Sequence, residues 1–422
     1  MEDIFNLRYA LDTLFFLIMG AFVMWMAAGF AMLEAGLVRS KNTTEILTKN
    51  ICLFAISCIM YMLVGYNVMY PGDSVSSFWP GFSFLLGADN QVEAVLSVTA
   101  DSWYDGAYYS SRADFFFQVV FVATAMSIVS GAIAERMKLF PFLVFAIVMT
   151  GFIYPIQGFW KWGGGFLDAA GFLDFAGSGV VHLCGAAAAL AGVILLGARK
   201  GKYGKNGKIH PIPGANLPMA TLGTFILWMG WFGFNGGSEL VISNAEEANA
   251  VAAIFVNTNA AAAGGVIAAL ITAKLIFGKA DLTMILNGAI GGLVGITAEP
   301  LTPSPELATL IGAVSGVLVI FSIITLDKLK LDDPVGAISA HGVCGIWGLV
   351  AVVLSNPDAN LLTQLYGAGV IFGFTFVISF VVWAVIKTAV GIRVSEEEEY
   401  AGVDISECGL EAYPEFTNAS KI

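Results

Sequence analysis

The chain has 422 residues, of which 57% are hydrophobic and only 12% are charged, and its mean hydropathy is +0.79. Soluble globular proteins carry about 25% charged residues, so this composition excludes a water-soluble fold and favours a protein embedded in lipid. The net charge of −12 argues against nucleic acid as a partner.

Apolar stretches long enough to cross about 30 Å of hydrocarbon predict an all-α polytopic membrane protein with eleven transmembrane helices. The chain opens with the acidic run MEDIF, so we interpret the first stretch as a true span rather than a cleavable signal peptide. The stretches fall near residues 12–36, 51–70, 114–134, 139–159, 174–197, 217–236, 250–273, 282–298, 307–326, 334–354 and 362–391.

An odd number of spans puts the two termini on opposite sides of the membrane. With the N-terminus outside, most of the 20 Lys and Arg residues fall on the inner side, and only Arg8, Arg112 and Lys161 fall outside. The positive-inside rule therefore predicts a multi-pass protein of an inner or plasma membrane, with its N-terminus outside and its C-terminus in the cytoplasm.

Two segments lie outside the apolar stretches and are long enough to have structure of their own. The outer loop 71–113 is expected to form an ordered cap with a short interfacial helix. The cytoplasmic tail 393–422 follows a membrane domain at 1–392, and its EEEE run at 396–399 is expected to be solvated and mobile. The five cysteines show no disulfide pattern.

Helices one to five and six to ten are interpreted as two copies of one five-helix unit, with the eleventh helix as an extra. Because five is odd, the second copy would be inverted in the membrane. A short match supports the repeat: VVHLCG contains His182 in the fifth helix, and SAHGVCG contains His341 in the tenth.

The positions of these two histidines predict that they meet. His182 follows Asp174 by eight residues and His341 follows Asp333 by eight residues, at opposite faces of the membrane. Eight helical residues rise about 12 Å, so both imidazoles would lie near the middle of the membrane. Ionisable groups there are costly and usually functional, although two histidines that merely bond neighbouring helices remain an alternative. The third histidine, His210, lies in a basic inner loop.

Six motifs along the chain resemble the ammonium transporter family (Amt/Rh, also Amt/MEP), in the family's order. They are AGFAMLEAGLVRSKN (28–42), GAIAERMK (131–138), DFAGSGVVHLCGAAAALAG from Asp174, WMGWFGFNGGS (228–238), NGAIGGLVGITA (287–298) and DDPVGAISAHGVCGIWG (332–348). The resemblance implies a homotrimer in the lipid bilayer with a pore in each subunit. It also implies ammonium or ammonia as the transported species, with no cofactor, no metal and no enzymatic activity.

The family's functional positions carry over to this chain motif by motif. They comprise the paired pore histidines, a pore-lining tryptophan, an aromatic gate and an outer ammonium-binding vestibule with a buried acid beside it. The corresponding residues are His182 and His341 for the pair, Trp231 for the pore wall, Phe121 and Phe234 for the gate, and Trp162, Phe121, Ser238 and Asp174 for the ammonium site.

The chemistry of these residue types fits ammonium. Each aromatic ring offers a cation an attraction of about 0.5–2 kcal/mol, and the Ser238 hydroxyl can accept a hydrogen bond. A neutral imidazole has one donor and one acceptor, so a pair of them can pass ammonia or relay a proton. Potassium has no proton to shed. Whether net charge crosses is left open.

Several of these assignments have structural alternatives. Asp174 would stabilise a bound cation by its charge, or its carboxylate would accept hydrogen bonds from backbone amides at the start of the fifth helix. Trp162, Phe121 and Phe234 would instead be interfacial or packing aromatics.

The main competing function is that of an ammonium sensor with little or no flux. Such sensors resemble the transporter but carry a fused signalling domain, for which the segment 393–422 leaves no room, so transport is expected. The chain contains no GxxxxGK[ST] loop and no Cys/His cluster typical of an enzyme or pump. The tail resembles the family's regulatory C-terminus, although Val403, Cys408 and Leu410 depart from the usual residues. A PII-type regulatory protein at the cytoplasmic face is implied by this resemblance alone.

Overall fold

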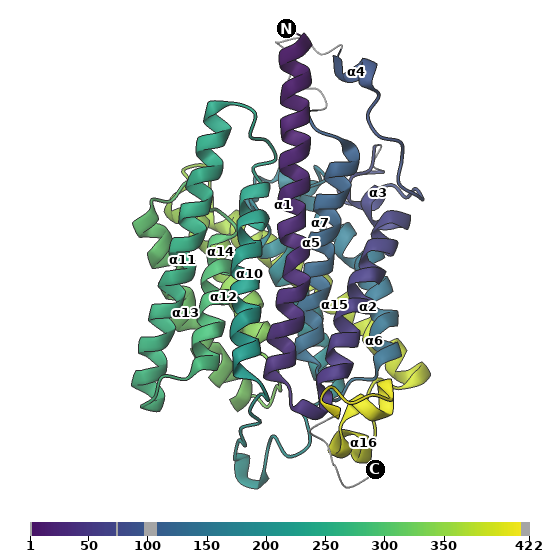
Figure 1. The fold of residues 1–422 in the computed structure, drawn as a ribbon, viewed down its shortest axis with the longest axis vertical. Coiled ribbons are helices and arrows are strands. Elements are labelled where there is room, and N and C mark those ends of the chain that lie inside the picture. Colours follow the sequence, from purple (N-terminus) through teal and green to yellow (C-terminus); the bar gives the residue numbers. More distant parts are fainter. Residues whose placement is uncertain (1, 73–74, 97–107, 415–422) are drawn as a thin grey trace.

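The computed structural model describes residues 2–72, 75–96 and 108–414, and these residues contain helices but no β-strand. The predicted all-α membrane class is therefore confirmed (Figure 1). The α-helices are α1 (Glu2–Leu37), α2 (Thr43–Met60), α3 (Tyr66–Met69), α4 (Val92–Leu96), α5 (Ser111–Ala132), α6 (Leu139–Val148), α7 (Tyr154–Lys161), α8 (Phe166–Ala169), α9 (Cys184–Leu196), α10 (Leu217–Gly237), α11 (Ala245–Phe277), α12 (Leu282–Ile296), α13 (Pro305–Lys328), α14 (Cys344–Ala351), α15 (Leu361–Val390) and α16 (Glu396–Ala401).

Nine helical segments of the described chain are long and apolar enough to cross a membrane. Two of them, Ser40–Met69 and Leu139–Ala169, contain α-helices that are joined through a π-helical turn. The nine segments coincide with the first seven, the ninth and the eleventh predicted stretches, although α1 begins at Glu2 rather than near residue 12. Two shorter apolar helices, Leu282–Ile296 and Ile338–Leu354, coincide with the eighth and tenth stretches. That each of these two crosses the membrane stays a prediction.

The long loop between α3 and α5 is described only in part, because residues 97–107 lie outside the described residues. The predicted short helix corresponds to α4, which has five residues. The described part of the loop is tied to the start of α5: the Ser110 hydroxyl donates to Asp89 Oδ2 at 2.8 Å, and Asn90 Nδ2 donates to the Tyr109 carbonyl at 2.8 Å.

Helices α1 and α10, the first helices of the two repeats, pack against each other in opposite directions. The end of α1 meets the start of α10, where a β-carbon at Gly36 would lie 2.4 Å from the Ala220 nitrogen. The middle of α1 meets the end of α10, where a β-carbon at Gly233 would lie 2.5 Å from Phe22 Cβ. This antiparallel contact agrees with the predicted inverted repeat, and the close approach uses small residues, as is typical of helix packing in membranes.

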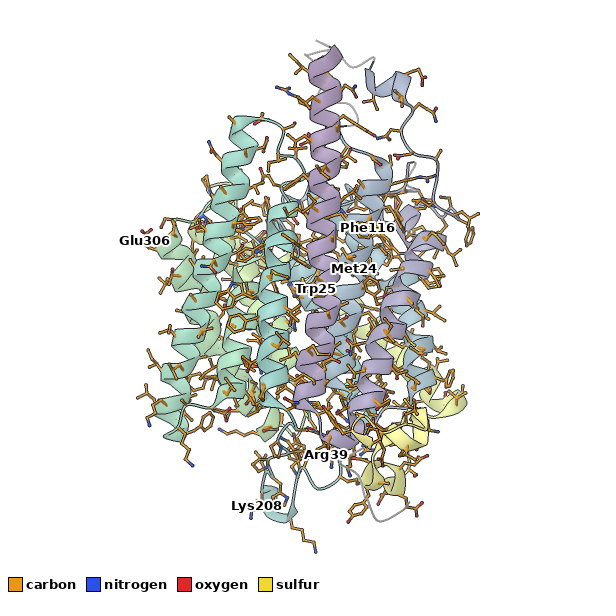
Figure 2. All side chains as sticks on the ribbon, in the orientation of Figure 1. Met24, Trp25, Arg39, Phe116, Lys208 and Glu306 are labelled. Carbon is orange, nitrogen blue, oxygen red and sulfur yellow. The ribbon has the colours of Figure 1, made fainter. Side chains whose placement is uncertain are left out.

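The surface is apolar at mid-height and charged toward the ends. Met24 and Trp25, 46% and 50% exposed, lie on the outer face of α1 at mid-height (Figure 2). Arg39 and Lys208 lie at the lower end in that view, where the tail also lies, and Glu306 lies toward the upper end. Exposed apolar side chains of this size are stable in lipid rather than in water.

A buried ion network holds the lower end of the bundle. Arg199 bonds to Asp332 at 2.8 Å and to Glu135 at 3.0 Å, and Glu135 also pairs with Arg39 at 2.8 Å. Burial opposes ionisation of Glu135, but the charge of Arg199 and the hydrogen bonds from Arg39 hold its pKa at about 2. Burial likewise opposes ionisation of Asp332, yet hydrogen bonds from Arg199 hold its pKa below the usual range. The network therefore joins the ends of four helices by charges that stay ionised at neutral pH.

The acidic run of the tail is solvated over most of its length, as predicted, but one of its glutamates is buried against the protein. Glu396 and Glu397 are exposed, and the mobility of the run stays a prediction. The run forms α16, which Ser395 begins with a capping box. Glu399 is only 2% exposed; its carboxylate accepts from the Lys200 backbone amide and from the Arg393 guanidinium. A charge run is usually solvated because burying carboxylates is costly, but here these two donors offset that cost.

Two further acids of the tail cap membrane helices. Neither α2 nor α6 is capped by the side chain of its own N-cap residue in the described structure. Instead, Asp404 Oδ1 accepts from the Glu45 amide of α2 at 2.8 Å, and Glu407 Oε2 accepts from the Leu139 amide of α6 at 2.8 Å. Such caps stabilise a helix by about 1 kcal/mol. The tail thus provides the N-terminal caps of two helices, α2 and α6, that begin at the lower end.

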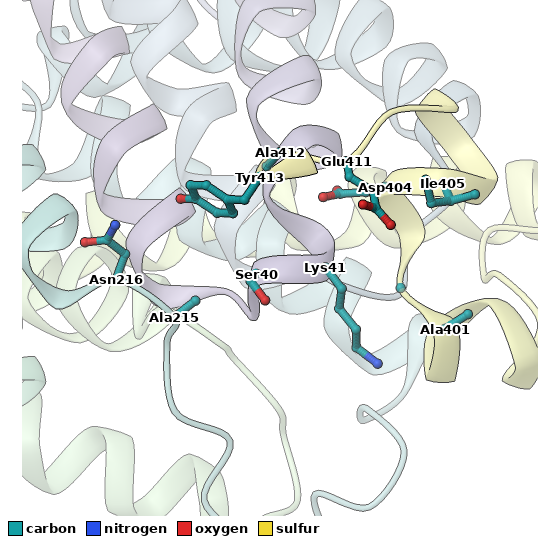
Figure 3. Close-up of a pocket in the computed structure, with 11 residues that line it drawn as sticks. Ser40, Lys41, Ala215, Asn216, Ala401, Asp404, Ile405, Glu411, Ala412 and Tyr413 are labelled. Atoms are coloured by element: carbon teal, nitrogen blue, oxygen red, sulfur yellow. The ribbon is translucent and has the colours of Figure 1, made fainter. Parts of the chain in front are cut away.

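A cavity of about 370 Å³ lies between the tail and the loops at the starts of α2 and α10. Figure 3 shows Asp404 and Tyr413 of the tail on one side of it, and Lys41 and Asn216 of the two loops on the other. Lys41 Nζ donates to the main-chain oxygens of Glu399 and Tyr400, so this lysine fastens the tail beside the cavity.

Candidate conduction pathway

Two phenylalanine rings close the upper part of the bundle. Phe121 on α5 and Phe234 on α10 are 1% and 0% exposed, and their rings stack with centroids 4.0 Å apart and planes inclined by 25°. These are the two residues that the sequence assigns to an aromatic gate. At this spacing the two rings are in contact and leave no open passage between them.

The other two upper residues lie beside this stack. Trp162, half-buried at the end of α7, packs its ring edge-on against Phe121 at 6.0 Å and donates its Nε1 hydrogen to the Asp174 carbonyl at 3.0 Å. Ser238 ends α10 one turn above Phe234, and its hydroxyl donates to the Phe234 carbonyl at 2.8 Å. Its oxygen lone pairs remain available as acceptors.

The two intramembrane histidines are in direct contact. Their Nδ1 atoms lie 3.1 Å apart and their rings are stacked at 5.1 Å, with His182 and His341 0% and 4% exposed. In a hydrogen bond between two Nδ1 atoms, one nitrogen donates and the other accepts. If both rings are neutral, the accepting histidine therefore carries its proton on Nε2 and the donating histidine has a bare Nε2.

The same local construction carries each histidine. Each lies in a six-residue π-helical turn, Ser178–Leu183 or Ile338–Val343, a geometry frequent at functional sites. An aspartate eight residues before each histidine accepts two backbone amides at the start of the turn, and a glycine three residues after that aspartate has positive φ. The residues are Asp174, Gly177 (φ 105°) and His182 in one copy, and Asp333, Gly336 (φ 82°) and His341 in the other.

The Asp174 carboxylate therefore has a clear structural role. Its Oδ2 accepts from the Gly179 and Val180 amides at 2.9 and 2.8 Å, and the residue is 1% exposed. Its Oδ1 accepts no hydrogen bond from the described residues. The capping interpretation of Asp174 thus has direct geometric support, and the contact of Asp174 with the Trp162 indole is through its main-chain carbonyl.

Aromatic rings continue from the phenylalanine stack to the histidines. The His182 ring stacks on Phe234 at 5.3 Å and on Trp231 at 5.1 Å. Trp231 is fixed because its Nε1 donates to Thr297 Oγ1 at 2.8 Å. These side chains present rings rather than oxygen ligands, so an ion stripped of water would be poorly compensated here. A neutral molecule of the size of water or ammonia would cross at much lower cost.

A cavity of about 490 Å³ lies near the turn that carries His341, and Gly336 and Ser339 are among its lining residues. Polar side chains line it, including Asn287, Asp333 and Ser339. The described residues thus bring together an aromatic stack and two imidazoles, and a separate cavity of mixed polar and apolar lining lies near the turn of His341.

Two buried glutamines near the histidines were missed in the sequence. Gln157 of α7 donates to the Val180 carbonyl at 2.8 Å, within the turn that carries His182. Gln364 of α15 bonds to the backbone of Leu173 and Leu349. Each is an uncharged polar residue within an apolar stretch, and an amide at that depth must find partners. An uncharged polar residue within an apolar stretch is therefore the sequence signal by which both glutamines could have been identified.

Comparison with known proteins agrees with this geometry. The model of the Ammonium Transporter Family matches residues 14–413. Ammonium transporter Amt2 of Archaeoglobus fulgidus is 41% identical over 97% of this chain and 90% of its own length. A putative ammonium transporter of Synechocystis, sll1017, is 42% identical over 96% of this chain and 90% of its own.

Solved structures share the fold. A structure described as a Sensor Amt Protein has a TM-score of 0.87 and 33% identity, covering 96% of this chain and 99% of that chain. The crystal structure of Candida albicans Mep2 has a TM-score of 0.81 and 25% identity, covering 99% of this chain and 93% of that chain.

Proposed function

The chain belongs to the Ammonium Transporter Family, and from this premise we propose that it moves ammonia across a membrane through the pathway of Phe121, Phe234 and the two histidines. Trp162, Phe121 and Ser238 bind the ammonium ion at the outer mouth, where ring faces and a hydroxyl oxygen replace part of its water. Asp174 adds a negative charge nearby.

Ammonia rather than the ion crosses the aromatic stretch. An uncompensated cation between Phe234 and Trp231 would cost many kcal/mol, whereas ammonium can leave its proton and potassium cannot. The contact between His182 and His341 is the observation that carries this proposal, because it supplies one donor and one acceptor in the middle of an apolar path.

The surrounding assembly follows from family membership and from the charge pattern. The protein is a homotrimer in a cell membrane, inner or plasma, with a pore in each subunit. The N-terminus is outside and the tail of 393–422 is cytoplasmic and regulatory, because the positive residues gather at the tail's end of the bundle. A PII-type protein binds at that cytoplasmic face.

A second candidate is an ammonium sensor with little or no flux, which the 33% identity to the Sensor Amt Protein favours. Uptake and current in proteoliposomes distinguish the two. We expect the wild-type protein to carry ammonium and to exclude potassium at the same concentration. Tight ammonium binding with no flux would contradict the transport proposal and leave the sensor. The ratio of transported charge to transported ammonia shows whether a proton crosses the membrane together with each ammonia molecule.

Replacing Asp174 by asparagine is expected to keep the fold but weaken ammonium uptake. An amide oxygen can still accept from Gly179 and Val180, so the cap persists. At roughly 10 Å and an effective dielectric constant of about 20, the lost charge is worth about 1–2 kcal/mol to a bound cation, which raises the half-saturating concentration about tenfold.

Asp281→Asn is the matched control for this change, since Asp281 caps α12 through the Thr283 and Met284 amides at the opposite end. Both variants should unfold at the wild-type temperature. A wild-type half-saturating concentration in Asp174→Asn would leave Asp174 with the capping role alone.

A further inference from the structure

The side chain of Gln364 is fully buried and fully bonded. It lies in the first turn of α15 and is 0% exposed. Its Oε1 accepts from the Leu173 amide at 2.8 Å, and its Nε2 donates to the carbonyls of Leu173 and Leu349 at 2.7 and 3.1 Å. One amide side chain thus serves three backbone groups on two other segments.

Those backbone groups lie where regular structure does not pair them. Leu173 is in the irregular segment between α8 and the Ser178–Leu183 turn, and Leu349 is in the last turn of α14. Carbonyls in a last helical turn have no partner within the helix. A buried backbone group left unpaired costs about 1–3 kcal/mol, so Gln364 fixes where these two segments lie.

The two segments are the ones that carry the histidines. Leu173 directly precedes Asp174, whose carboxylate begins the turn of His182, and α14 continues directly from the turn of His341. The segments also touch, because a β-carbon at Gly345 of α14 would lie 2.7 Å from the Ser178 carbonyl oxygen. A shift of either segment would change the contact between the two imidazoles.

The position of α15 itself is fixed beside the same segment. One turn beyond Gln364, a β-carbon at Gly367 would lie 2.2 Å from the Phe172 ring, so helix and ring are in close contact. Helix α15, which carries Gln364, is therefore held close to the segment to which Gln364 is hydrogen-bonded.

We propose that Gln364 is a positioning residue that sets the distance and orientation between His182 and His341. This inference rests on the proposed function, in which that contact lies on the path of ammonia. Gln364 touches neither imidazole; it acts through Leu173 and Leu349.

The test uses the full chain in lipid with ¹⁵N-labelled histidine. A His210→Ala background leaves only the two pore histidines labelled. Gln364→Met keeps the length of the side chain and removes all three hydrogen bonds. Ser379→Ala is the control on the same helix, since the Ser379 hydroxyl is buried and has no hydrogen-bond partner among the described residues. The measurements are the imidazole ¹⁵N spectrum and ammonium flux per inserted protein.

In Gln364→Met we expect the spectrum to lose the signature of the shared Nδ1 hydrogen bond. We expect flux to fall about tenfold or more, because a displacement of about 1 Å between reacting groups costs up to about a hundredfold. Ser379→Ala should match wild type in both. Gln364→Glu keeps the acceptor for the Leu173 amide and regains a donor when protonated. The ¹⁵N spectrum and the ammonium flux of Gln364→Glu should therefore lie between those of wild type and Gln364→Met, and closer to wild type at acidic pH. This variant provides the test if Gln364→Met does not fold.

The outcomes separate this inference from the proposed function. An unchanged ¹⁵N spectrum in Gln364→Met, with or without loss of flux, overturns the positioning role. A changed spectrum in a protein whose wild type carries no ammonium supports the positioning role and contradicts the transport proposal.

Discussion

Replacing His182 by alanine is expected to lower ammonium-specific flux by at least about a hundredfold, in the range by which positioned acid–base groups usually act. The change removes one of two imidazoles whose Nδ1 atoms are 3.1 Å apart and leaves the His341 nitrogen without its partner. It also opens a space between Phe234 and His341 that water can enter. Potassium should then gain entry, so the ratio of ammonium to potassium flux should fall as well.

The chain supplies its own control in His210. This histidine lies in the exposed loop at the lower end, where its Nδ1 contacts the Gly201 carbonyl at 2.9 Å, far from the imidazole pair. His210→Ala should transport like wild type in the same liposomes. A His182→Ala protein that kept the wild-type rate and the wild-type exclusion of potassium would refute the assignment of the conduction pathway to the two histidines.

The second large effect is expected on stability. Arg199→Met removes the cation that joins Glu135 and Asp332, whose side chains are 0% and 1% exposed. Glu135 keeps its pair with Arg39, but Asp332 loses the ion pair that the structure gives it. Removing one partner of a buried ion pair typically costs about 3–5 kcal/mol. Unfolding of the purified protein in detergent, followed against temperature or denaturant, measures this loss.

The pH dependence of that loss has a definite sign. The pKa of Glu135 is lowered in the folded protein to about 2, against about 4 for an unperturbed glutamate. Its contribution is therefore fully present above the unfolded value and is lost as the pH falls through the folded value. The difference between wild type and Arg199→Met should be largest at neutral pH and shrink below about pH 4.

Lys200→Met is the matched control for Arg199→Met. Lys200 is the next residue and also pairs with an acid, Glu396, but both side chains are largely exposed, and exposed pairs contribute little. The unfolding midpoint of Lys200→Met should equal that of wild type. Equal midpoints for both variants would mean that the network at the lower end does not hold the bundle.

Much of this architecture could be predicted because it depends on local composition or on simple depth. The apolar stretches locate the membrane helices, since lipid requires such stretches whatever the tertiary contacts. Counting eight residues from Asp174 and from Asp333 puts both histidines at the same depth, and the structure has them in contact. The aromatic residues needed the family motifs, because an isolated phenylalanine in an apolar stretch looks like any packing residue.

The remainder depends on contacts between distant residues. Gln364 and Leu173 are 191 positions apart, and Asp404 and Glu45 are 359 positions apart. No periodicity links such pairs. The π-helical turns are equally hidden, because the sequence pattern does not show where the backbone hydrogen bonds of a helix shift by one residue. The burial of Glu399 could not be predicted for the same reason, since its donor Lys200 lies 199 positions away.

The caps that the tail provides have a consequence for how the protein is made. The N-terminal ends of α2 and α6 leave the ribosome hundreds of residues before Asp404 and Glu407, and chains fold from the N-terminus during synthesis. Until the tail is made, the first turns of both helices have backbone amides at the lower end of the bundle that only water can satisfy. A segment that is translated after α15 therefore caps two of the earliest helices, so these helices are complete only once residues 404–407 have been made.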